Sequence, residues 1–138
     1  MKLTDGVYTA LITPFQNDMS LDLEGLKENI NFQMENGVQG IVALGTTGEC
    51  PTIEESEKEL IISVAKEALN ERGHLMVGTG SYSTKATIKA TKKASEHGAD
   101  SALVVAPYYN KPPQEGIVKH LFEIADASPI PIILYNVP

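Results

Sequence analysis

The chain has 138 residues, which is enough for one ordinary domain, and its 18 acidic against 11 basic side chains give a formal charge of -7. This acidic balance argues against binding to nucleic acid, because contacts with phosphate need a basic face. No apolar run reaches the roughly 18 residues that span a bilayer, the first residues do not resemble a signal peptide, and the single cysteine, Cys50, excludes an internal disulfide, so we expect a cytoplasmic protein with no membrane partner.

Short apolar runs rich in β-branched residues alternate with amphipathic segments of helical length. The helical segments carry apolar residues three and four positions apart, and glycines such as Gly37 and Gly98 follow two of them as stop signals. In chain order the pattern predicts strand 7–12, helix 22–36, strand 40–44, a helix that begins with the capping box Thr52-Ile53-Glu54-Glu55, strand 75–79, helix 84–97, strand 102–106, helix 114–127 and strand 130–135.

The strands and helices recur about every 30 residues, the length of one βα unit. Near-continuous apolar strands are typical of a parallel sheet covered by helices. The order predicts an α/β fold with residues 1–138 in one domain, built either as an open doubly wound sheet or as part of a (β/α)8 barrel. Thr13-Pro14-Phe15 stands where a dinucleotide-binding sheet has its G-x-G-x-x-G motif. A complete barrel needs about 250 residues, so this chain would supply only part of one.

Three polar clusters follow apolar runs directly, at the points where strands end. They are Gly45-Thr46-Thr47-Gly48-Glu49, the pair Tyr108 and Tyr109 in a proline-bounded loop, and Tyr135. Because the carboxyl ends of parallel strands carry ligands in α/β proteins, these hydroxyls are candidates for an active-site rim that holds a small carboxylate and relays protons. They also fit structural roles: threonines that satisfy a turn, tyrosines that pack at an interface, and a core tyrosine.

Other catalytic classes have little support in the sequence. His74, His97 and His120 lie singly, without the spacing of a metal site, and we expect them at the surface or at helix ends. The chain has neither a G-x-S-x-G elbow nor a Walker-type phosphate loop, and Cys50 is interpreted as a partly covered thiol near the rim rather than a nucleophile. We therefore expect no metal and no cofactor.

Five motifs together resemble the dihydrodipicolinate synthase family, one of the pyruvate-dependent, Schiff-base class I aldolases. They are Thr13-Pro14-Phe15, Gly45-Thr46-Thr47-Gly48-Glu49, Gly78-Thr79-Gly80, Pro107-Tyr108-Tyr109-Asn110-Lys111-Pro112 and Tyr135-Asn136-Val137-Pro138. The resemblance extends over the entire chain. It implies a (β/α)8 barrel, of which this chain supplies about the first five strands, assembled as a homotetramer of two tight dimers.

The resemblance implies that the complete protein condenses pyruvate with L-aspartate 4-semialdehyde on the route to diaminopimelate and lysine. In this family a lysine on the sixth strand forms an imine with pyruvate; it would fall beyond Pro138, so these 138 residues are expected to be inactive alone. Tyr135 would match the tyrosine that shuttles protons, and Thr46 the hydroxyl that links it to a second tyrosine. Tyr109 would match that second tyrosine, donated across the dimer interface, and Thr47 the residue that helps hold the pyruvate carboxylate.

Two alternatives stay open at this point. One is a related pyruvate aldolase that acts on a sugar acid such as N-acetylneuraminate, and the other is a non-catalytic half-barrel. The paired threonines and the Tyr-Tyr-Asn-Lys-Pro loop favour the synthase. We also expect weak or absent feedback by lysine, because lysine-inhibited members place histidines and polar side chains where this chain has Glu55, Lys58, Tyr82 and Ala86.

Overall fold

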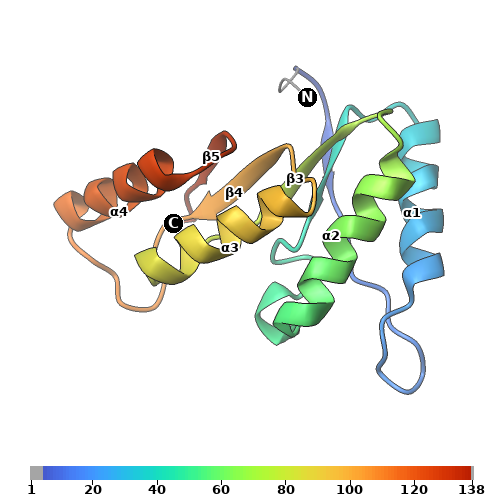
Figure 1. The fold of residues 1–138 in the computed structure, drawn as a ribbon, viewed down its shortest axis with the longest axis horizontal. Helices are drawn as coiled ribbons and strands as arrows, with labels where there is room; N and C mark the ends of the chain where they lie inside the picture. The colour runs from blue at the N-terminus through green and yellow to red at the C-terminus, as the bar shows by residue number, and fades with distance from the viewer. Residues whose placement is uncertain (1–4, 138) are drawn as a thin grey trace.

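The computed structural model describes residues 5–137, in which strands and helices alternate along the chain (Figure 1). The elements are β1 (Tyr8–Ala10), α1 (Leu23–Glu35), β2 (Gly40–Ala43), the 3-10 helix η1 (Cys50–Thr52), α2 (Glu55–Leu69), β3 (His74–Gly78), α3 (Thr84–Glu96), β4 (Ser101–Val105), α4 (Gln114–Ala127) and β5 (Ile132–Tyr135). Every predicted strand and helix is present, and the order of the elements is confirmed.

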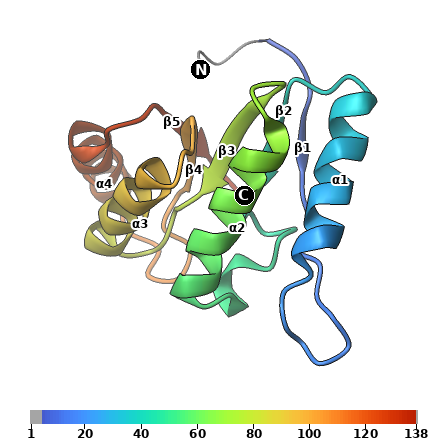
Figure 2. The same cartoon turned by 45° about the vertical axis from the view of Figure 1, so that its right-hand side comes forward.

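Each strand pairs in parallel with the next strand along the chain, which gives the order β1-β2-β3-β4-β5. In an open doubly wound sheet the strand order reverses at one point and helices cover both faces. Here α1 to α4 follow one another along one side of the strands (Figure 1, Figure 2). Within residues 5–137, this one-sided winding without a reversal is the arrangement of a barrel wall, and it decides between the two predicted architectures.

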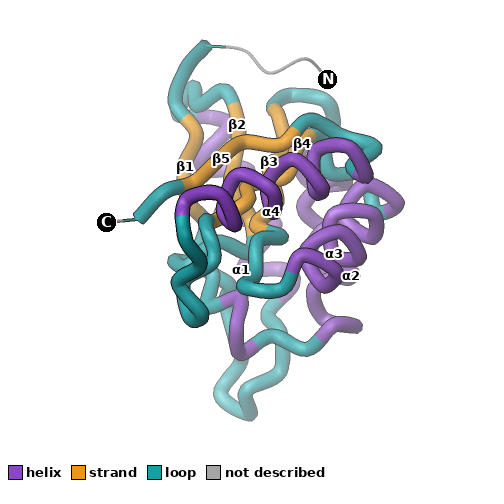
Figure 3. The backbone as a smooth tube through the Cα atoms, turned by 90° about the vertical axis from the view of Figure 1, so that its left-hand side faces the viewer, coloured by secondary structure: helices purple, strands orange, loops and turns teal. Residues whose placement is uncertain are grey.

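The main core lies between the sheet and helices α1, α2 and α3, and a smaller one lies between β4 and α4. Figure 3 shows α2, α3 and α4 beside the strands. Successive side chains of a strand point to opposite faces, and Ile41, Leu75 and Val77 face the helices. They pack with helix residues that recur at helical spacing, namely Leu26, Ile30, Ile61, Ala65 and Leu69. Full burial of each leucine or isoleucine contributes roughly 1.5–3 kcal/mol relative to exposure. This layer therefore fixes the helices on one face of β2 and β3.

The start of α2 differs from the prediction, which placed a capping box at Thr52. Glu54 is the N-cap instead, and its backbone N–H donates to the Glu57 carboxylate at 2.9 Å. The shift arises because the preceding residues form η1, with Pro51 in its first turn. Within that turn the Thr52 hydroxyl donates to the Glu49 carbonyl oxygen at 2.9 Å, so it does not cap α2.

Two of the three histidines are buried, so the expectation that they lie at the surface or at helix ends is wrong for them. His74 opens β3, and its Nε2 lies 2.7 Å from the Ser101 hydroxyl oxygen on β4. His120 lies one turn before the buried Ile124 on the inward face of α4, and its Nδ1 is 2.9 Å from the Thr84 hydroxyl oxygen. A neutral imidazole with a hydrogen-bond partner is accommodated in a core, and polarity alone does not reveal such a position.

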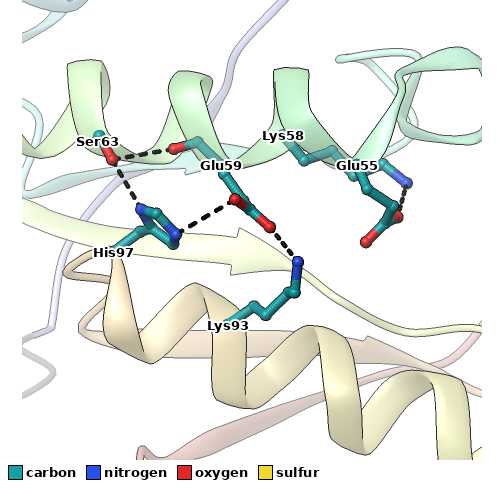
Figure 4. Close-up of polar contacts among 6 residues, drawn as sticks. All are labelled: Glu55, Lys58, Glu59, Ser63, Lys93 and His97. Carbon is teal, nitrogen blue, oxygen red and sulfur yellow. Dashed lines mark hydrogen bonds and ion pairs between the residues drawn. The ribbon is translucent and has the colours of Figure 1, made fainter.

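The expectation is confirmed for His97, which is the C-cap of α3. Its Nδ1 is 3.0 Å from the Ser63 hydroxyl oxygen and its Nε2 is 3.7 Å from the Glu59 carboxylate, both on α2 (Figure 4). Lys93 of α3 donates a hydrogen bond to the same carboxylate, which holds the pKa of Glu59 below its usual range. These half-exposed side chains link α2 to α3.

The buried histidines predict a loss of stability on acidification. Burial lowers the pKa of His74 and of His120 below the ordinary value of 6.5, because it disfavours the charged ring. As the pH falls, the two histidines are therefore protonated in the unfolded chain before they are protonated in the folded one. The stability that the neutral, buried histidines contribute is complete above pH 6.5 and is lost as the pH falls through their folded-state pKa values.

Urea unfolding between about pH 7.5 and pH 5.5 measures this effect. We expect the free energy of unfolding to fall over this range, and to fall less steeply in His74→Gln and His120→Gln. A free energy of unfolding that stays constant over the range would contradict the prediction.

Candidate functional site

The carboxyl ends of the strands meet at one edge of the sheet, here called the carboxyl edge. The parallel register sets Val77 beside Ala43 and Tyr135 beside Val105. The loops that follow β2, β3 and β4 therefore leave the sheet on the same side, together with the end of β5. All four residues that the sequence predicted for the site lie at this edge or in the loops that leave it.

The loop after β2, residues 45–49, carries Thr46 and Thr47. A buried hydroxyl supports it from below: Thr13, in the segment after β1, donates to the Gly48 carbonyl oxygen at 2.7 Å. The Thr46 and Thr47 side chains stay exposed at the surface of the loop. Sequence reasoning did not identify Thr13 as this support, although its position in the Thr-Pro-Phe motif was the available signal.

Glycines allow the strand ends to approach one another closely at this edge. A Cβ atom added to Gly78, the last residue of β3, would overlap the carbonyl oxygen of Leu44, the residue that follows β2. A Cβ atom added to Gly80 would overlap the backbone nitrogen of Val105 on β4. Only a residue without a side chain fits at these two positions, and the loops that bear the site are held close together as a result.

Tyr135 ends β5, and its carbonyl oxygen accepts a hydrogen bond from the Ala106 N–H at 2.9 Å. In the register it pairs with Val105, whereas Leu134 pairs with Val104, which packs in the core with α4. Tyr135 therefore lies on the face turned away from the helices, which is the interior face of a barrel. The residue is 40% exposed, so its side chain is accessible to a ligand.

The loop after β4 carries Tyr108 and Tyr109, which pack around Tyr82 from the loop after β3. The ring centroids of Tyr82 and Tyr108 are 5.6 Å apart in an edge-on arrangement, and those of Tyr82 and Tyr109 are 5.5 Å apart at a tilt of 53°. Asn110 Nδ2 donates to the Tyr82 carbonyl oxygen at 3.3 Å. We call Tyr82, Tyr108 and Tyr109 the tyrosine cluster; Tyr109 is its most exposed member, at 80%.

Thr46 and Tyr135 share the carboxyl edge but do not touch. Strands β3 and β4 lie between β2 and β5, and neighbouring strands are about 4.8 Å apart, so roughly 14 Å separate the two strand ends along the wall. Among residues 5–137, no hydrogen bond joins Thr46 to Tyr135 or to Tyr109. A ligand at the centre of the edge would be needed to connect their hydroxyls, so their catalytic roles stay predictions.

Cys50, the first residue of η1, is half-buried, which confirms the interpretation of a partly covered thiol. Burial raises its pKa, and Glu55 adds to this while Lys58 opposes it. A thiol with a raised pKa is a poor nucleophile at neutral pH, because the thiolate is the reactive form. In the part of the chain that the structure describes, no group of three or more potential metal ligands is found, and no helix is long and apolar enough to cross a membrane.

Residues 3–138 match the sequence model of the Dihydrodipicolinate synthetase family. The chain belongs to this family. A 4-hydroxy-tetrahydrodipicolinate synthase of Methanococcus vannielii is 49% identical over 96% of this chain and 46% of that protein. One from Protochlamydia amoebophila is 54% identical over 96% of this chain and 44% of that protein. The chain thus spans about half the length of the curated relatives it matches.

Solved structures of the family carry the same arrangement of strands and helices. The dihydrodipicolinate synthase of Thermotoga maritima is 45% identical and superposes with a TM-score of 0.94 over 96% of this chain and 45% of that chain. These neighbours are (β/α)8 barrels, so the predicted fold is confirmed: the chain supplies β1 to β5 of such a barrel.

The support from Thr13 can be tested by removing its hydroxyl. Thr13→Val keeps the shape of the side chain but leaves the Gly48 carbonyl oxygen without its buried donor, and we expect a loss of about 1–2 kcal/mol in the free energy of unfolding. Thr52→Val is the matched control, because it removes a similar bond to a carbonyl oxygen from an exposed residue of the same region and should cost less than about 0.5 kcal/mol. Equal losses of unfolding free energy in the two variants would contradict the assignment of Thr13 as the buried support of the loop.

Proposed function

We propose that this chain forms the N-terminal part of a 4-hydroxy-tetrahydrodipicolinate synthase, a lyase that condenses pyruvate, held as a lysine imine, with L-aspartate 4-semialdehyde. The observation that carries the proposal is the identity of 49% and 54% to relatives of that name, over 96% of this chain. We further infer the homotetramer and the cytoplasmic location that membership of this family implies.

The loop after β2 offers the groups that a small carboxylate needs. Thr46 and Thr47 are both exposed at the carboxyl edge, and their loop is held by the buried bond from Thr13. Hydroxyl donors on a fixed loop bind a carboxylate at low entropic cost, because the loop is ordered before the ligand arrives. We assign Thr47 to binding of the pyruvate carboxylate.

We assign the proton transfers of imine formation to Tyr135, Thr46 and Tyr109. When an amine adds to the ketone carbon of pyruvate, the carbinolamine oxygen must gain protons to leave as water, and the nitrogen must lose them. A phenol or hydroxyl fixed near that oxygen supplies these transfers without bulk solvent. Tyr135 suits this role because it lies on the interior face at the mouth of the barrel and is accessible.

Tyr109 is assigned to the site of a second subunit. Its 80% exposure on a loop that projects from the carboxyl edge supports this assignment, since a side chain so placed is free to enter a neighbouring molecule. A tyrosine donated across an interface would make each site depend on assembly of the dimer.

The relay can be tested in the full-length enzyme by deleting single hydroxyls. Tyr135→Phe and Thr46→Val should each lower kcat about 100-fold, within the usual range for loss of general acid–base catalysis. Thr47→Val should instead raise the KM for pyruvate. Tyr8→Phe is the control, because Tyr8 lies at the start of β1, at the opposite end of the strands, and kcat should stay unchanged. A Tyr135→Phe enzyme with wild-type kcat would remove Tyr135 from the relay.

The substrate can be tested by direct comparison. We expect the full-length enzyme to consume pyruvate with aspartate semialdehyde and to leave N-acetylneuraminate uncleaved. Cleavage of the sugar acid with no turnover of the semialdehyde would favour the related aldolase. Binding of pyruvate without turnover of either substrate would favour the non-catalytic half-barrel.

The residues at the start of α2 and before α3 favour the expectation that lysine inhibits the enzyme weakly or not at all. Lys58 Nζ and the Glu55 carboxylate form an ion pair at 2.9 Å (Figure 4), and Tyr82 is engaged in the tyrosine cluster. A cationic amino acid would meet the Lys58 ammonium group and a tyrosine ring in place of histidines and polar side chains. We expect rates at millimolar lysine to stay close to the uninhibited rate, and half-maximal inhibition at submillimolar lysine would contradict this.

A further inference from the structure

We propose that Tyr82 is a positioning residue that holds Tyr109 in the orientation that the relay requires; this inference rests on the proposed function. Tyr82 lies in the loop between β3 and α3, and Tyr109 lies in the loop between β4 and α4. The two loops are neighbours at the carboxyl edge because β3 pairs with β4. Tyr82 therefore acts on the relay through Tyr109 rather than through the substrate.

The loop that carries Tyr109 has few attachments of its own. Tyr108, Tyr109 and Asn110 are all exposed, and Lys111 adopts a left-handed backbone with a φ of 39°. Among residues 5–137, the ring contacts and side-chain hydrogen bonds that tie Tyr108, Tyr109 and Asn110 to the rest of the chain all end on Tyr82. Tyr82 thus contacts two aromatic rings and accepts one hydrogen bond from an amide.

Tyr82 is itself placed on a rigid support. The backbone N–H of Ser81 donates to the hydroxyl of Thr87 at 3.0 Å, and Thr87 is fully buried on α3. On its other side, Ser83 is the N-cap of α3 and accepts a hydrogen bond from the Ala86 N–H at 3.3 Å. Tyr82 is therefore held between two residues bonded to α3, and it can transmit that order to the more weakly attached loop.

The aromatic contact, rather than the Tyr82 hydroxyl, is the element that the geometry assigns to this role. Edge-on and tilted pairs with centroids 4.5–7 Å apart are attractive beyond the area they bury. Their separations of 5.6 Å and 5.5 Å place both pairs in that range. Tyr82→Phe keeps both rings in contact, whereas Tyr82→Ala removes them, so the two variants separate the ring from the hydroxyl.

Steady-state kinetics of the full-length enzyme test the proposal. We expect Tyr82→Ala to lower kcat about tenfold with the KM for pyruvate unchanged, and Tyr82→Phe to retain the wild-type kcat. If Tyr82→Ala fails to fold, Tyr82→Leu replaces it, because leucine keeps the apolar bulk without the ring. Wild-type kcat in the ring-less variant, or an equal loss in Tyr82→Phe, would overturn the proposal.

A double-mutant comparison shows whether Tyr82 acts through Tyr109. In a Tyr109→Phe enzyme the relay hydroxyl is already absent, so adding Tyr82→Ala should lower kcat by less than about twofold. A further tenfold loss in that background would assign Tyr82 a general structural role instead.

Limited digestion with chymotrypsin, which cleaves after tyrosine, measures how often the loop after β4 opens, independently of enzymatic activity. We expect cleavage after Tyr108 or Tyr109 to be about tenfold faster in Tyr82→Ala than in Tyr82→Phe, because the loop opens more often. Unchanged cleavage would overturn the positioning role whatever the kinetics show. If the wild-type enzyme does not condense aspartate semialdehyde, the proposed function fails, and the cleavage rates still decide whether Tyr82 holds the loop.

Discussion

Each of strands β1 to β5 is hydrogen-bonded in parallel to the next strand along the chain, and the positions of the helices and of the candidate site follow from this pairing. A parallel neighbour can be reached only by a crossover, so a helix lies between each pair of strands and packs on the same side. All the strands then end at one edge. Hydroxyls that are far apart in the sequence, such as those of Thr46 and Tyr135, come to the same end of the molecule by this geometry alone.

The two ends of the sheet carry polar groups of different kinds. At the amino ends of the strands, His74 and Ser101 are buried, and the hydrogen bond between them satisfies His74 Nε2 and the Ser101 hydroxyl. At the carboxyl ends, the side chains of Thr46, Thr47 and Tyr109 are exposed, and within residues 5–137 no hydrogen bond engages their hydroxyl groups. In barrel enzymes the amino end serves stability and the carboxyl end serves chemistry. The side chains of these five residues follow that division.

Three residues fix the positions of the strand ends and loops at the carboxyl edge. Gly78 lets β3 approach the end of β2, and the Thr13 hydroxyl holds the loop that bears the threonines. The ring of Tyr82, in the loop after β3, contacts the loop after β4. Each of these three residues contacts a neighbouring loop or strand. The site therefore depends on residues outside the hydroxyl set.

The sequence by itself determined the alternation of strands and helices, the candidate residues Thr46, Thr47, Tyr109 and Tyr135, and the family, because these depend on local periodicity and on motifs that stay contiguous in the chain. The tertiary structure alone decided where α2 begins and which histidines are buried, and it showed directly the one-sided winding that the family resemblance implied. Local pattern is the same for an open sheet and a barrel wall, and a helix start moves when a proline turn precedes it. The burial of His74 and the ring contacts of Tyr82 depend on strands and loops that meet only after folding, so no spacing along the chain records them.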